Sequence, residues 1–99
     1  MKIIHKMLHH LEEEVEGAKE YAEKYIENKA KNNIPRATKF KEMAMDELKH
    51  ASTLHEFDMA DVEEIKKVYE MSDEDSTAWE HGQKHLIEQM ALVKHMLEM

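Results

Sequence analysis

The chain has 99 residues with a formal net charge of −8 at pH 7, and this length is typical of a single domain, expected over residues 1–99. The acidic balance excludes wrapping of nucleic acid, which needs clustered Lys and Arg, and the absence of Cys excludes disulfides and thiolate metal sites. No apolar run has the length of a signal peptide or a membrane span, so we expect a soluble, cytoplasmic protein with no membrane partner.

The first predicted element is a helix from about residue 3 to about residue 30, because apolar residues recur there at helical spacing. These residues are Ile4, Leu8, Leu11, Val15, Ala18, Ala22 and Tyr25. Asn32, Asn33 and Pro35 then predict a turn followed by a new helix, since Asn favours caps and Pro favours the first helical turn.

The second predicted helix begins at this turn. Its apolar stripe is expected to contain Phe40, Met43, Ala44, Glu47, Ala51 and Leu54. Two alternatives stay open near residues 58–61. Either the chain breaks there and Asp61 caps a short helix, or the second helix continues to about residue 70.

The third predicted helix starts near Ser72, which has Asp75 at capping-box spacing, and runs close to the C-terminus. Its inward residues are expected to be Trp79, Leu86, Met90, Val93 and Leu97. There is no strand candidate. The expected fold is therefore all-α, a long antiparallel helical hairpin followed by a C-terminal helix.

Glu47 and His50 form the one Glu-x-x-His pair of the second helix, and residues three apart lie on the same helix face. A chain rich in Glu and His yields such a pair by chance, so the position of the pair decides its meaning. Glu47 is expected in the middle of the apolar stripe, where an unpaired charge is strongly unfavourable. Two interpretations are open: a metal ion bound by Glu47 and His50, or a metal-free hydrogen-bonded pair.

The first helix offers three carboxylates that could complete such a site, namely Glu13, Glu14 and Glu16. Helical geometry places Glu14 about 80° and Glu16 about 120° from the centre of the apolar stripe, with Glu13 almost opposite it. The expected register of the hairpin weakly favours Glu16 instead, because a turn at residues 31–34 puts Glu16 closer than Glu14 to the level of Glu47 along the helix axis. The angular argument favours Glu14, which shares a line of the helix with Met7, His10 and Tyr21.

These motifs resemble the ferritin and rubrerythrin superfamily, and most closely the encapsulated ferritins. That family has two adjacent Glu, an apolar residue, a third Glu and, five positions later, Tyr. The same order occurs in residues 13–21, and Glu-x-x-His-Ala follows in residues 47–51. The resemblance covers about residues 8–57. It implies that Glu14, Glu47 and His50 bind metal, that Tyr21 lies beside the metals, and that Glu13 and Glu16 lie on the route by which metal arrives.

Two features depart from that family. The chain ends Lys94-His95-Met96-Leu97-Glu98-Met99, without the glycine-rich extension that targets encapsulated ferritins to their shell, so an encapsulin shell is not an expected partner. The helix expected at residues 73–98 is also longer than the family's C-terminal part, which argues against its ring-shaped assembly.

The ligand count predicts a homodimer, because a di-metal carboxylate site takes two Glu-x-x-His pairs and this chain supplies one. Two copies are then expected to dimerise into a ferritin-like four-helix bundle. The expected function is a ferritin-like di-metal site between two copies, with iron, or else Mn or Zn, as the cofactor and ferroxidase chemistry as its activity. A non-catalytic helical interaction protein is the alternative. His81, His85 and Glu88 share a face of the third helix, which is interpreted as solvated.

Overall fold

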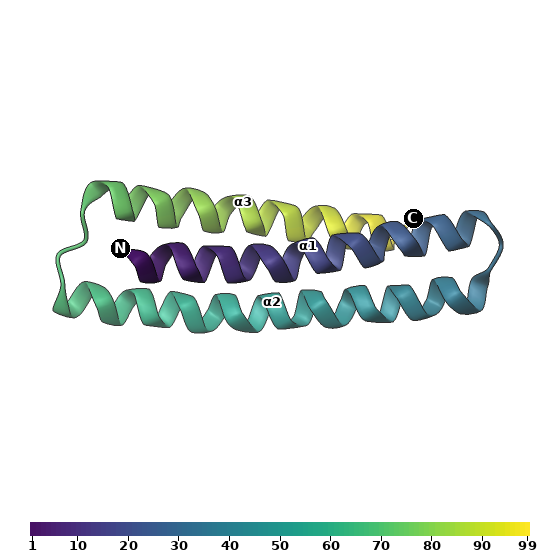
Figure 1. The fold of residues 1–99 in the computed structure, drawn as a ribbon, viewed down its shortest axis with the longest axis horizontal. Helices are drawn as coiled ribbons and strands as arrows, with labels where there is room; N and C mark the ends of the chain where they lie inside the picture. Colours follow the sequence, from purple (N-terminus) through teal and green to yellow (C-terminus); the bar gives the residue numbers. More distant parts are fainter.

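Three long helices account for almost the whole chain in the computed structural model, which describes residues 1–99. Helix α1 spans Lys2–Ala30, α2 spans Ile34–Val68 and α3 spans Asp73–Leu97. Figure 1 shows α1 between the other two in a rod of 54 × 18 × 18 Å. Helix α2 runs antiparallel to α1, and α3 runs parallel to α1. The all-α class and the hairpin plus a C-terminal helix are confirmed.

The turn between α1 and α2 is built from the Asn residues that the sequence singled out. Asn32 has a φ of 60°, a left-handed conformation that Asn tolerates at a helix C-terminus. The backbone N–H of Asn33 donates to the carbonyl of Asn28 (2.9 Å), and the Asn33 side chain accepts from the N–H of Arg36. Pro35 lies in the first turn of α2, where its missing N–H has no helical partner to lose.

Helix α2 continues without a break through residues 58–61 and ends at Val68, which decides between the two alternatives. No Gly or Pro interrupts this stretch, and Val62 is buried on the face that continues the core. The chain then crosses to α3, whose N-terminus is capped by the Ser72 hydroxyl accepting from the N–H of Asp75 (3.1 Å). The predicted capping position is confirmed.

The core lies along α1, which packs closely against both other helices, while the backbones of α2 and α3 are farther apart and these two helices meet through side chains such as Val62 and Trp79. All five predicted inward residues of α3 are buried. Close approach of α3 to α1 depends on Gly82, because a β-carbon there would stand 2.7 Å from both methyl carbons of Leu8. A smaller apolar cluster of Ile4, Val62 and Trp79 closes the end of the rod near the α2–α3 connection.

The buried face of α2 differs from the predicted stripe. Leu48 is buried, whereas Met43 is 40% exposed and Glu47 is only half-buried. The prediction that Glu47 lies at the centre of the stripe was therefore wrong. The reason is that the buried face extends toward α3, where Leu48 and Leu97 line a shared groove, so Glu47 lies on the opposite flank.

None of the three helices is both long enough and apolar enough to cross a membrane. A single chain supplies three helices, so the four-helix bundle expected from two copies stays a prediction.

Candidate metal centre

Three donor side chains converge where α1 and α2 lie side by side, namely those of Glu14, Glu47 and His50. One donor atom from each residue lies within 4.8 Å of the other two, and no other set of three His, Asp or Glu residues meets this condition. Nδ1 of His50 lies 3.9 Å from Oε2 of Glu14. The spacing of three residues in α2 turns Glu47 and His50 to the same flank, and the register of the hairpin brings Glu14 beside them.

The carboxylate of Glu14 carries a buried oxygen with no partner. Its Oε2 atom is out of contact with solvent and accepts no hydrogen bond, although the side chain as a whole is 24% exposed. Buried carboxylate oxygens are normally paired, because leaving one unpaired is costly. A cation between this oxygen and His50 would satisfy it. Two carboxylates and one imidazole are also a donor set that Fe(II), Mn(II) and Zn(II) accept.

Glu47 is held in an environment that disfavours its charge. The neighbouring carboxyl of Glu14, with which a protonated Glu47 can share a hydrogen bond, is the largest cause of its raised pKa, and burial is the second. Two carboxyl groups this close repel each other when both are ionised. A proton shared between the two carboxyls relieves this repulsion, and a bound cation would relieve it as well.

Gly17 makes room for this carboxylate. A β-carbon at residue 17 would lie 3.3 Å from Oε2 of Glu47, closer than an ordinary contact. The sequence analysis did not single out Gly17. The feature that could have identified it is its place in the interior of a predicted helix. Glycine weakens a helix there, so its presence usually indicates that another group approaches the backbone closely.

The cluster opens into a cavity of about 670 Å³ whose lining comes only from α1 and α2. The lining residues are His10, Glu14, Asp46, Lys49, His50, Thr53 and Leu54. His50 is 62% exposed on this side, so a ligand can reach it without rearrangement of the core. The sequence placed His10 on the same line of α1 as Glu14 but gave it no role.

The other candidate residues lie outside the cluster. Glu13 is exposed and pairs with His9 at 2.8 Å, and Glu16 is exposed. Tyr21 is half-buried and stacks on Phe40, with ring centroids 6.4 Å apart. The structure therefore places Tyr21 in a packing contact.

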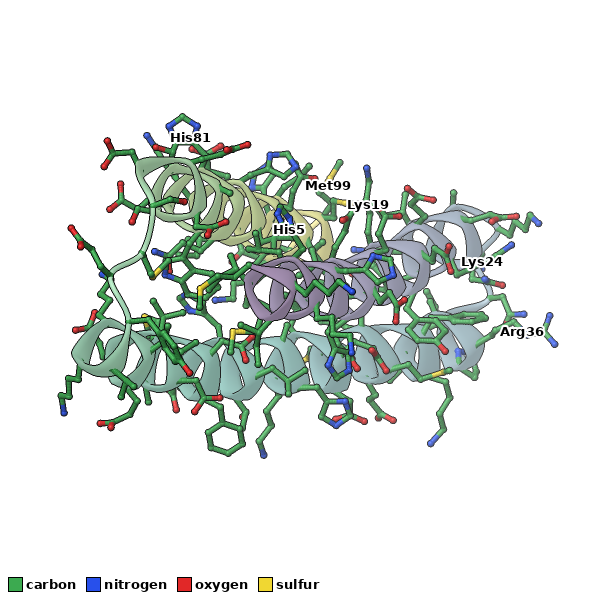
Figure 2. All side chains as sticks on the ribbon, turned by 60° about the vertical axis from the view of Figure 1, so that its left-hand side comes forward. His5, Lys19, Lys24, Arg36, His81 and Met99 are labelled. Carbon is green, nitrogen blue, oxygen red and sulfur yellow. The ribbon has the colours of Figure 1, made fainter.

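The histidine-bearing face of α3 does not converge on a donor group. His81, His85 and Glu88 are exposed, and Figure 2 shows His81 pointing away from the other two helices.

Comparison of the chain with protein-family models, with curated proteins and with solved structures gives no match.

Proposed function

We propose that this protein is a ferritin-like metal-binding protein whose site, made of Glu14, Glu47 and His50, is doubled in a homodimer to hold two iron-class ions. The observation that carries the proposal is the convergence of these donors around the unpartnered Oε2 atom of Glu14. The motif spacing agrees with it, because the same three residues match the ferritin-like pattern.

Each side chain has a distinct task in this proposal. His50 supplies the nitrogen donor from the solvent side, and Glu14 supplies a carboxylate from α1. Glu47 lies against Gly17 and beside Glu14, and in this proposal it is the carboxylate shared between two ions. Iron would supply the redox chemistry of a ferroxidase, the oxidation of Fe(II) by oxygen or peroxide. Mn or Zn would fit the same donors without that activity.

A second copy has an accessible face on which to dock. The cavity is lined by α1 and α2 alone, so α3 does not cover it. The flank of α2 that carries His50 also carries Met43 and Phe57, which are 40% and 61% exposed. Exposed apolar side chains beside a half-set of ligands suit a two-fold interface, in which each copy supplies one Glu-x-x-His.

The same exposed side chains favour a second candidate function, a helical protein that binds another protein and no metal. Phe57 and Met43 would be its contact residues. The two functions differ in one measurable quantity, the metal content of the purified protein.

The test is elemental analysis of protein purified from iron-supplemented cells, beside Glu47→Ala and His50→Ala. The proposal expects about one ion per chain in the wild type and none in either variant, with helical circular dichroism in all three. Oxygen consumption after addition of Fe(II) then tests the ferroxidase activity. Metal-free wild-type protein that takes up no Fe(II), Mn(II) or Zn(II) on titration would favour the interaction protein.

A further inference from the structure

A second histidine faces the cavity in front of the cluster. His10 precedes Glu14 by four residues, which places the two side chains on one face of α1, and both line the same cavity as His50. On α2, Glu47 and His50 are three apart and also share a face. His10 and Glu14 of α1 and His50 of α2 thus line one cavity, and Glu47 lies beside Glu14 and His50 within the cluster.

No hydrogen bond holds His10 away from this space, although its lowering influence on the pKa of Asp58 shows that this carboxyl of α2 also lies near it. Its imidazole makes no hydrogen bond or ion pair, whereas His9 is paired with Glu13 and His55 is hydrogen-bonded to Gln83. The side chain is exposed, so rotation about its own bonds displaces nothing from the core.

The other polar residues of the cavity are poorer donors. Lys49 is a cation, and Thr53 has only a neutral hydroxyl. Asp46 is exposed and precedes His50 by four residues, so it also faces the cavity, but it is not among the donors that converge with Glu14 and His50.

We propose that His10 is a fourth metal donor, so that one chain offers two imidazoles and two carboxylates to a single ion. This inference rests on the proposed function and extends it to metal selectivity. A set of two nitrogens and two oxygens suits Zn²⁺ or Co²⁺, which prefer nitrogen more than Mn²⁺ does. The first ion is then held within one chain before any second copy docks.

The experiment compares the full-length variants His10→Ala and His9→Ala, with Glu47→Ala as the reference for loss of the site. His9 is the matched control because it is the adjacent, exposed histidine on a different helix face. Zn²⁺ and Mn²⁺ affinities are measured by competition with a chelator, and the ring signals of His10 are followed by NMR during Zn²⁺ addition.

The expected result is that His10→Ala weakens Zn²⁺ binding by about tenfold or more, weakens Mn²⁺ binding much less, and that the His10 ring signals shift with bound Zn²⁺. His9→Ala should match the wild type. Equal Zn²⁺ affinity in the two His variants, while Glu47→Ala loses binding, would overturn the role of His10 alone. Equal affinity in all three variants and the wild type would overturn the proposed function as well.

Discussion

The backbone of Gly17 in α1 faces the carboxylate of Glu47 in α2, with 3.3 Å between Oε2 and the position that a β-carbon would take. Glycine in a helix interior is less stable than alanine by about 1 kcal/mol. The chain therefore keeps a weaker helix at the point where the carboxylate lies. This relationship leads to the first prediction.

Gly17→Ala should stabilise the metal-free protein and weaken metal binding. The carboxyl group of Glu47 is the flexible end of its side chain and can move by a few tenths of an ångström, so the gain in helix propensity of about 0.5–1 kcal/mol should prevail. The shifted carboxylate no longer meets Glu14 and His50 at the same point. Thermal unfolding with a chelator and a Zn²⁺ titration measure the two effects, and unchanged affinity would contradict this reading.

Gly82→Ala should give the opposite pattern, lower stability with unchanged metal affinity. Its β-carbon would stand 2.7 Å from both methyl carbons of Leu8 and 3.2 Å from its Cγ, so the whole branched end of Leu8 must move out of its contact with α3. Overpacking of this kind costs about 1–3 kcal/mol. Urea unfolding measures the loss, and the same Zn²⁺ titration measures the affinity. A variant as stable as the wild type would show that α3 can move away from α1 at little cost.

Protonation of Glu47 should raise the free energy of unfolding of the metal-free protein as the pH falls from neutral toward 4.5, which is the ordinary pKa of Glu. Its pKa is raised in the folded state, first by the Glu14 carboxyl and then by burial, so the folded chain binds this proton at a higher pH than the unfolded chain. Stability therefore falls as pH rises from 4.5 through the raised pKa.

Glu47→Gln is the control for this pH dependence, because an amide does not titrate. Unfolding free energies of both proteins are measured with a chelator present, and the difference between the two curves isolates Glu47 from the other carboxylates. Parallel curves would show that Glu47 does not carry the effect.

Glu14→Ala should abolish metal binding, while Glu13→Ala and Glu16→Ala should at most slow uptake. Only Glu14 is part of the convergent group, and the other two carboxylates are exposed. Isothermal titration gives the stoichiometry of each variant, and stopped-flow uptake gives the rate. Loss of binding in Glu16→Ala with retention in Glu14→Ala would reverse the assignment.

Phe57→Asp should convert the proposed homodimer into a monomer without unfolding it. Phe57 is 61% exposed, so its replacement leaves the core intact, while a charge in an apolar interface is unfavourable. Ile87→Asp, at an apolar residue of α3 that is 48% exposed, is the matched control. Sedimentation velocity at micromolar concentration reports the state of each. A monomeric wild type that binds two ions would contradict the dimer.

Much of the fold was predictable because its determinants are local. The helical periodicity of α1, the Asn-rich turn and the cap at Ser72 depend on neighbouring residues, and all three were confirmed. The exposure of Met43 and burial of Leu48 were not predictable in this way. They depend on where α3 packs, which no residue of α2 encodes by itself.

The candidate site was predictable to the extent that helix geometry fixes it. Spacing placed Glu47 and His50 on one face and favoured Glu14 over its neighbours, and these three residues do converge. Their role as metal ligands stays a prediction. The fit of Gly17 against Glu47 could not be foreseen, because it depends on the register between two helices.

Helix α3 packs mainly on α1 and meets α2 through fewer side chains, which implies that local opening is unequal along the fold. One side-chain hydrogen bond between α2 and α3 joins His55 to Gln83, so α3 detaches by losing its large interface with α1 and a smaller apolar contact with α2 around Val62 and Trp79. The α1–α2 hairpin with its cluster would stay closed during that event. Amide hydrogens of α3 should then exchange faster than those of α1, and bound metal should slow exchange across the hairpin while leaving α3 almost unchanged.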